Sequence, residues 1–142
     1  MVNKSLIFGA FLGLILFASL FGNIAVHEFG HWMVAEHYGL SPQMHFGETL
    51  DGEKASLFSA SFFTTYSAPV CSDQDLFVTL AGPMANIVMA VLFTLLYFKM
   101  PKKTFKINML FLVIIIPAVL SAIVNLLPLP LSDGATIFSY LK

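Results

Sequence analysis

The hydrophobic positions of this chain gather into three long segments, from Leu6 to about Tyr38, from Leu76 to about Phe98, and from Ile107 to about Leu127. Each segment is long enough for a helix that crosses a bilayer, which needs about 20 apolar residues. Shorter and more polar stretches separate the three. The pattern therefore predicts one domain over residues 1–142, all-α and integral to a membrane, with three transmembrane helices.

The first segment is longer than a membrane requires, since as a helix it measures about 50 Å against roughly 30 Å of hydrocarbon. Gly22 and Asn23 are poor helix formers within it, but no proline follows them. We therefore expect one unbroken helix that tilts or protrudes and ends near Gly39, a residue suited to a C-terminal cap.

Between the first and second segments the chain leaves the helical pattern. Asp51-Gly52 is a turn signal, and the stretches on either side, Gln43 to Phe46 and Ala55 to Tyr66, are rich in Phe, Thr and Ser. They predict a short β-hairpin that lies at the membrane surface, with an apolar face that shields part of the protein.

The third segment is followed by Asn125-Leu126-Leu127-Pro128-Leu129-Pro130-Leu131-Ser132-Asp133-Gly134. Pro128 and Pro130 cannot continue a helix, so the sequence predicts a proline-broken C-terminal segment with irregular backbone near membrane depth. Such backbone is tolerated only where it is buried in protein or lines a wet cavity. We expect water to reach the protein interior along this polar stretch.

The composition agrees with lipid as the solvent. Of the 142 residues 58% are hydrophobic and 11% are charged, and the mean hydropathy is +0.85, whereas soluble domains average about a quarter charged residues. The seven basic residues are all lysines and the net charge is −1, which argues against a nucleic-acid partner. The single cysteine, Cys71, excludes an internal disulfide and a zinc site built on thiolates.

The segment His27-Glu28-Phe29-Gly30-His31 carries the chemistry of the first helix. On a helix His27 and His31 stack on one face, close enough to bind one metal ion, and Glu28 projects beside them. The pattern is typical of zinc proteases, in which Zn²⁺ activates a water and polarises the scissile carbonyl while the glutamate moves the proton to the leaving amine. Ionisable side chains at membrane depth are costly and usually functional, which argues against ordinary helix-surface residues.

A catalytic zinc needs a third protein ligand, and the sequence offers several. His37 has the spacing of an extended three-histidine motif, but Val34 replaces that motif's glycine and a continuing helix would turn His37 away. Glu48 and Glu53 lie in the turn-rich segment. Asp133 is the better candidate, because it directly follows the proline-broken stretch; it could also cap a short C-terminal helix.

Two further asparagines lie inside apolar segments. In Gly82-Pro83-Met84-Ala85-Asn86 the proline loosens the second helix, the glycine lets another backbone approach, and the asparagine must find a partner. Asn125, near the end of the third segment, could donate a hydrogen bond to the oxyanion of a tetrahedral intermediate. For each asparagine the alternative is a contact that only joins helices.

In this order on three spans, HEFGH, AGPMAN and NLLPLPLSDG resemble the site-2 protease family of intramembrane zinc metalloproteases. The resemblance implies His27, His31 and Asp133 as zinc ligands, Glu28 as general base and Asn125 as a substrate or oxyanion contact. Family members cut membrane-anchored proteins in or beside a transmembrane helix. The expected function is therefore regulated intramembrane proteolysis by a multi-pass protein of the cell membrane, with the bilayer, the substrate and an oligomer or accessory subunit as partners.

The remaining residues that the motifs single out for structure or substrate contact are Gly82, Pro83, Asn86 and Pro128. The chain departs from the family pattern at Ser132, where an apolar residue is usual. The hairpin segment could supply an edge strand to an unwound substrate.

Membrane orientation stays open. Lys4 and the Lys99 to Lys106 loop predict a cytoplasmic N-terminus, whereas the resemblance implies the reverse. Two competing functions are a catalytically inactive membrane protein of the same fold, which binds metal or a partner, and a small transporter or channel subunit.

Overall fold

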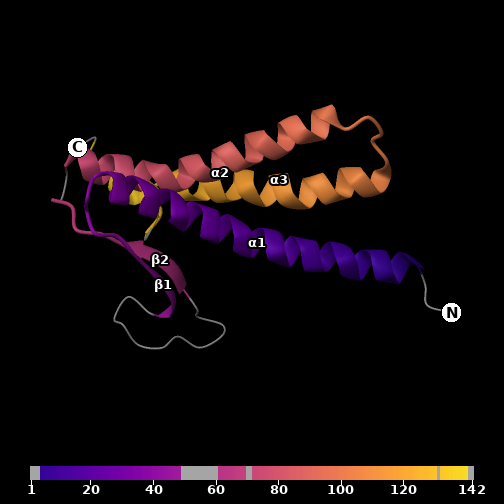
Figure 1. Ribbon diagram of the computed structural model, residues 1–142, viewed down its shortest axis with the longest axis horizontal. Helices are drawn as coiled ribbons and strands as arrows, with labels where there is room; N and C mark the ends of the chain where they lie inside the picture. The colour runs from indigo at the N-terminus through magenta and orange to yellow at the C-terminus, as the bar shows by residue number, and fades with distance from the viewer. Residues whose placement is uncertain (1–3, 49–60, 70–71, 131, 141–142) are drawn as a thin grey trace.

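The computed structural model describes residues 4–48, 61–69, 72–130 and 132–140, which form four helices and two strands (Figure 1). The helices are α1 (Lys4–His37), α2 (Asp73–Lys99), α3 (Phe105–Leu126) and α4 (Asp133–Ser139), and the strands are β1 (Gln43–Glu48) and β2 (Ser61–Thr65). Helices α1, α2 and α3 are each long and apolar enough to cross a membrane. They pack together lengthwise, and the strands and α4 lie at the end of the bundle opposite the N-terminus (Figure 1).

Helix α1 runs without a break through Asn23, as predicted. It ends in a Schellman motif, in which Gly39 adopts a φ of 69° and the Leu40 N–H donates to the Ala35 carbonyl at 3.0 Å. Ala35 and Leu40 then pack on Val78 of α2 in a small buried apolar cluster. The cap thus ends the helix where the sequence predicted and directs the chain into the hairpin.

Helix α2 contains Pro83, which the sequence predicted to loosen it. The helix nevertheless continues to Lys99, and Pro83 is fully buried. Proline has no N–H, so the carbonyl of Thr79, four residues earlier, lacks its usual helical partner. Pro83 therefore modifies the local hydrogen bonding of α2 without ending the helix.

Helix α3 ends where the prolines begin. Its last residue is Leu126, and Leu127 is extended with φ −75° and ψ 145°, the conformation that a residue before proline prefers. The prediction that Pro128 breaks the third helix is confirmed. The chain then reverses and returns to the bundle as α4.

Ser132 caps α4: its Oγ accepts a hydrogen bond from the Ala135 N–H at 3.3 Å and donates one to the Leu127 carbonyl at 2.6 Å. Asp133 is the first residue of the helix, so the suggestion that Asp133 itself is the cap is wrong. Serine at position 132 has a structural reason, because it ties α4 to the end of α3. The side chain of Asp133 is left free to point elsewhere.

Strands β1 and β2 form the predicted hairpin as a two-stranded antiparallel sheet, with Gln43 opposite Thr65 and Phe46 opposite Phe62. The predicted turn at Asp51-Gly52 and the start of the predicted second strand lie outside the described residues. Strand β2 packs on α1, where the Thr64 hydroxyl donates to a backbone carbonyl at 3.0 Å. The hairpin is thereby fixed to the metal-motif part of α1.

Candidate metal centre

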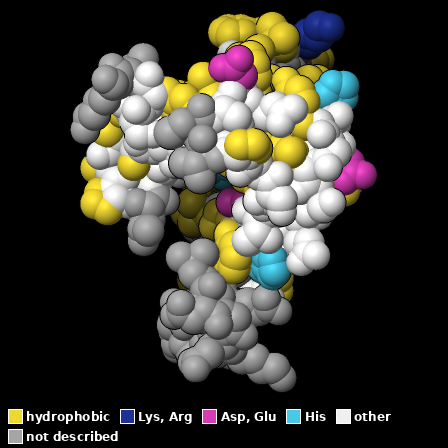
Figure 2. Space-filling model, turned by 90° about the vertical axis from the view of Figure 1, so that its left-hand side faces the viewer, with side chains coloured by type: hydrophobic (Ala, Val, Ile, Leu, Met, Phe, Trp, Pro, Cys, Tyr) yellow, Lys and Arg dark blue, Asp and Glu magenta, His cyan; other side chains and the backbone are white. Residues whose placement is uncertain are grey.

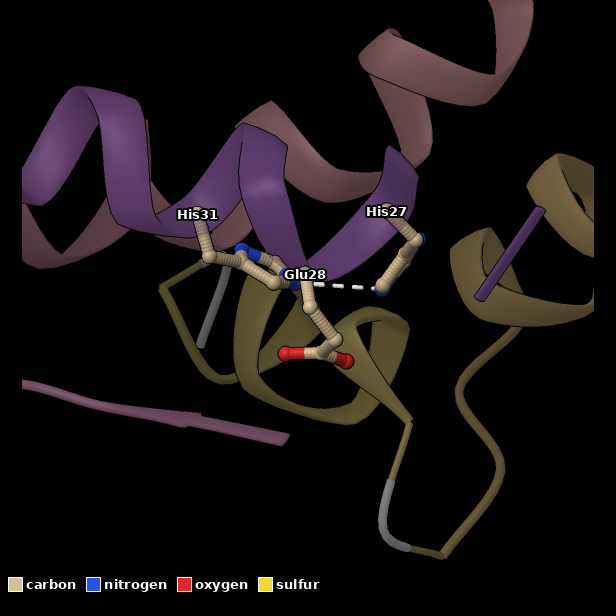
Figure 3. A group of neighbouring side chains, drawn as sticks. All are labelled: His27, Glu28 and His31. Atoms are coloured by element: carbon tan, nitrogen blue, oxygen red, sulfur yellow. Dashed lines mark hydrogen bonds between the residues drawn. The ribbon is translucent and has the colours of Figure 1, made fainter. Parts of the chain in front are cut away.

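His27, Glu28 and His31 project from one turn of α1 and lie close together (Figure 3). One potential ligand atom from each lies within 4.8 Å of the other two. The two histidines are buried, with 5% and 7% of their surface exposed, although they stand on a helix whose outer face is apolar. Their spacing of four residues brings the rings together because residues four apart share a helix face.

Asp133 reaches this group from α4. Its Oδ2 lies 2.9 Å from His27 Nε2, its Oδ1 lies 3.5 Å from His31 Nε2, and the two Nε2 atoms are 3.1 Å apart. These separations are near the roughly 3.3 Å expected between ligand atoms of a tetrahedral zinc ion with bonds of about 2.0–2.1 Å. Oδ2 is buried and, among the described residues, forms no hydrogen bond despite its closeness to His27. The two Nε2 atoms and the Asp133 carboxylate are therefore spaced as the ligands of a single metal ion would be.

Charge supports the same arrangement. Burial by itself would raise the pKa of Asp133, but the neighbouring His31 and His27 imidazoles more than offset it, and the pKa is lowered. The carboxylate is therefore ionised at neutral pH, as a metal ligand must be.

The orientation of His31 is set by α2. Its Nδ1 lies 2.7 Å from the Val78 carbonyl oxygen, which can only accept a hydrogen bond, so Nδ1 carries the proton. In the neutral ring Nε2 then bears the lone pair, and Nε2 is the atom nearest Asp133. Histidines that bind metals are commonly held through such a bond to the other ring nitrogen.

His27 is held by Asn86 of α2, which is completely buried. The Asn86 Nδ2 atom lies 3.4 Å from His27 Nδ1 and donates to the Ser121 hydroxyl of α3 at 2.8 Å. Its Oδ1 has no hydrogen-bond partner among the described residues. Asn86 thus joins three helices, as the helix-contact interpretation of the sequence suggested, and it also contacts one of the two histidines.

Asn125 lies farther along this network. Its Nδ2 donates to the Ser121 carbonyl at 3.0 Å, one turn back in its own helix. Together with Asn23 and Ser121 it lines a mainly apolar cavity of about 760 Å³ between α1 and α3. The described contacts of Asn125 are with Ser121 and not with the histidines, so its predicted contact with an oxyanion stays a prediction.

Gly82 makes room for the two imidazoles. A Cβ atom at this position would lie 2.7 Å from His27 Nε2 and closer still to the ring of His31. The sequence had suggested that Gly82 admits another backbone; the nearest groups that an added Cβ would meet are the histidine rings. The close backbone approach occurs at Gly30, where an added Cβ would meet the Ala81 carbonyl oxygen at 2.6 Å.

A polar cavity of about 240 Å³ opens beside the cluster, lined by Glu28, His31, Phe63, Thr64, Tyr66, Thr79, Asp133 and Thr136. Seen from this end of the molecule, acidic and histidine side chains interrupt the surface, and an acidic side chain lies in a recess near its centre (Figure 2). Strand β2 supplies one wall of the cavity and α4 another. Glu28 and His31 therefore line a polar space of their own beside the cluster.

Sequence reasoning missed a second polar cluster next to this cavity. The Tyr66 hydroxyl donates to Asp75 Oδ1 at 2.8 Å, and the Tyr140 hydroxyl donates to Asp75 Oδ2 at 2.5 Å. Burial, with the hydrogen bond and charge of Asp75, raises the pKa of Tyr66 to about 12, so the phenol keeps its proton at neutral pH. A carboxylate at the start of a membrane-length helix was the available signal.

Of the predicted site residues, the structure brings together His27, Glu28, His31 and Asp133. His37 lies apart from them, at the end of α1 in another cavity, with Met33 and Phe77. Glu53 and the side chain of Glu48 lie outside the described residues. No protein-family model, curated protein or solved structure matches the chain.

Proposed function

We propose that this protein is a zinc-dependent endopeptidase of the cell membrane that hydrolyses peptide bonds in or near transmembrane segments of other proteins. The observation that carries the proposal is the convergence of His27, His31 and Asp133 on one point, with Glu28 facing the adjoining polar cavity. All four residues belong to an assembly of helices with lipid-length apolar surfaces. The motif resemblance to site-2 proteases points to the same function.

The donor set suits zinc. Two imidazole nitrogens and one carboxylate are a common ligand set for catalytic Zn²⁺, which keeps its fourth position for water or substrate. Asp133 Oδ2 lies 2.9 Å from His27 Nε2 without forming a hydrogen bond, an arrangement that an ion held between the three side chains would account for. Gly82 leaves room for the two imidazole rings that would hold this ion. A bound Zn²⁺ would supply Lewis acidity, making a water more acidic and polarising the scissile carbonyl.

Glu28 is the proposed general base. It follows His27 directly, so its carboxylate is set about 100° around the helix from the first ligand and faces the cavity. There it accepts a proton from the attacking water and passes it to the leaving amine. Asn125 is kept as a candidate contact for the substrate carbonyl.

Strand β2 is the proposed docking edge for the substrate. Phe63 and Thr64 line the cavity that contains Glu28, and within the described residues β2 pairs with β1 alone. A protease must reach an extended backbone, and an unwound segment can add to a free strand edge through main-chain hydrogen bonds. This arrangement would lay the scissile bond along the wall of the cavity.

Asn86 is the proposed partner that fixes the ring of His27. If its amide turned by 180°, the partnerless Oδ1 would take the place of Nδ2 and accept hydrogen bonds from His27 Nδ1–H and from the Ser121 hydroxyl. His27 would then present the lone pair of Nε2 to the ion, as the neutral ring of His31 would. Both ligands would thus have a hydrogen-bond partner outside the metal site.

The decisive test replaces Glu28 by Gln in protein reconstituted with Zn²⁺ and a model transmembrane substrate. We expect unchanged zinc content and cleavage reduced by about 10²- to 10⁴-fold, because only the proton acceptor is lost. Glu36→Gln, an exposed position on the same helix, is the matched control and should cleave normally. Equal cleavage by the Glu28 variant and the wild type would overturn the mechanism, and zinc binding without cleavage in the wild type would favour an inactive metal-binding protein.

The identity of the third ligand has its own test. Asp133→Ala should lower zinc affinity by about 100-fold or more, because an ionised ligand is removed from a buried site. His37→Ala should leave zinc affinity unchanged, since His37 lines a different cavity. Zinc content measured by mass spectrometry after dialysis against a graded chelator decides between them, and the opposite result would reassign the site.

A further inference from the structure

Asp75, in α2, forms hydrogen bonds with residues from two other parts of the chain. Its Oδ1 accepts the Tyr66 hydroxyl from the chain that follows β2, and its Oδ2 accepts the Tyr140 hydroxyl from the end of α4. Ser72 fixes the position of Asp75 in the first turn of α2, where its Oγ accepts the Asp75 N–H at 3.1 Å. One carboxylate therefore holds two phenols from segments separated by more than 70 positions in the chain.

Each tyrosine directly follows the C-terminal end of an element that contributes residues to the candidate site. Tyr140 directly follows α4, a helix of seven residues whose first residue is Asp133. Tyr66 directly follows β2, whose Phe63 and Thr64 wall the cavity beside Glu28, and Tyr66 itself lines that cavity. The Tyr66 hydroxyl also lies 3.3 Å from the Thr79 hydroxyl of α2.

A helix of seven residues cannot hold its own geometry in isolation, because helices shorter than about 12 residues are marginal without tertiary contacts. Helix α4 is attached at its start through Ser132 and at its end through Tyr140. Of these two attachments, the one at Tyr140 connects α4 to α2, the helix that also orients both histidines through Val78 and Asn86. The position of the Asp133 carboxylate relative to the imidazoles thus depends on the Tyr140–Asp75 hydrogen bond.

We propose that Asp75 is a positioning residue with two separable branches: through Tyr140 it sets Asp133 on the metal, and through Tyr66 it sets the β2 wall at which substrate docks. The inference rests on the proposed function for the meaning of both branches. It assigns to Asp75, Tyr66 and Tyr140 a role that none of the sequence motifs suggested. None of these three residues is among the proposed metal ligands or is the proposed general base.

The experiment compares Tyr140→Phe with Tyr66→Phe, two variants that each remove one hydroxyl from the same acceptor. Tyr140→Phe should lower zinc affinity roughly tenfold, in the range found when the outer partners of metal ligands are lost, with KM unchanged once zinc is saturating. Tyr66→Phe should leave zinc affinity at the wild-type value and raise KM several-fold, with little change in kcat. Asp75→Ala should show both effects, because it removes both oxygens that accept the tyrosine hydroxyls.

Hydrogen exchange of the full-length, metal-free protein in detergent gives a readout that needs neither zinc nor cleavage. We expect Tyr140→Phe to raise exchange several-fold within Asp133–Ser139 and not in Ser61–Thr65, and Tyr66→Phe to do the reverse. Tyr97→Phe, which removes a hydroxyl bound to Asn108 at the other end of the bundle, is the control and should change neither segment.

The outcomes separate this inference from the proposed function. If the wild type binds no zinc or does not cleave, the proposed function fails, while hydrogen exchange still tests the two branches. If both single variants loosen both segments alike, or if Tyr140→Phe leaves zinc affinity and the exchange of α4 at wild-type values, the two-branch assignment is wrong.

Discussion

The two ends of the helix bundle are built in opposite ways. At the hairpin end every helix contributes buried residues, from Asn23 onward in α1, up to Ala90 in α2 and from Pro117 to Ala122 in α3. At the other end, among the described residues, none of the three helices has a fully buried residue, and large apolar side chains such as Phe17 and Phe105 are about two-thirds exposed. Lysines gather at that end, with Lys103 over the rings of Tyr97 and Phe98 and Lys106 over that of Phe8.

What is buried at the hairpin end is mostly small or polar. Asn23, His27, His31, Thr79 and Asn86 are all nearly inaccessible, whereas the exposed surface is dominated by Leu, Ile, Val and Phe. In water this distribution would be unstable, but in lipid an apolar side chain gains nothing by leaving the surroundings. The comparison indicates that close backbone approach and hydrogen bonds around the histidine cluster hold this bundle together, and that the remaining length of the helices is apolar enough to cross a membrane.

The largest expected effect is on zinc affinity, and it is tested by comparing one glycine from each end of the bundle. Gly82→Ala would place a Cβ against both imidazole rings, so we expect zinc affinity to fall by about 100-fold or more as the ligands are displaced. Gly13→Ala meets no atom within 4 Å and should leave zinc affinity unchanged. Competition with a zinc-sensitive chelator measures both, and an unaffected Gly82 variant would show that the rings do not bind metal in this arrangement.

An intermediate effect is expected for buried amides. Asn86→Ala removes the partner of His27 and should reduce zinc affinity by roughly 10- to 100-fold, the usual consequence of losing a partner that orients a ligand. Asn108→Ala, at the lysine end, breaks the hydrogen bond from Tyr97, far from the histidines, and should not alter zinc binding. Calorimetric zinc titration of the two variants would distinguish them; equal affinities would mean that Asn86 only joins helices.

The smallest effect concerns packing alone. Ala118 of α3 is completely buried and Val119 beside it is 41% exposed. Ala118→Leu should destabilise the protein by about 1–3 kcal/mol through overpacking, whereas Val119→Leu should change stability by less than about 0.5 kcal/mol. Thermal unfolding in one detergent, at matched protein concentration, provides the comparison. If the two variants were destabilised equally, packing around the buried Ala118 would be no tighter than packing around the exposed Val119.

Much of the fold could be predicted because helices that can cross a membrane are recognisable as long, unbroken apolar segments. The three apolar segments matched α1, α2 and α3 closely, and the cap at Gly39 and the break at Pro128 were correct because glycine and proline restrict the backbone locally. The hairpin was also predicted from local turn and strand signals. The roles of Ser132 and Gly82 were not, since a cap and a steric gap depend on which residues come near in space.

The candidate site divides in the same way. The sequence by itself determined that His27 and His31 share a face and that Glu28 stands beside them, because helical periodicity fixes these relations within one turn. It indicated Asp133 from its place after the prolines, but the contact across more than 100 residues exists only because α3 ends at Leu126 and α4 folds back.

Only the tertiary structure decided the hydrogen-bond partners around the site: Val78 for His31, Asn86 for His27, and Asp75 for the two tyrosines. Each of these contacts joins separate elements, and their positions depend on helix packing. Local sequence carries no signal for which carbonyl, amide or carboxylate will come to lie beside a given side chain. The local chemistry of the metal motif was therefore readable from the chain, and its surroundings required the assembled bundle.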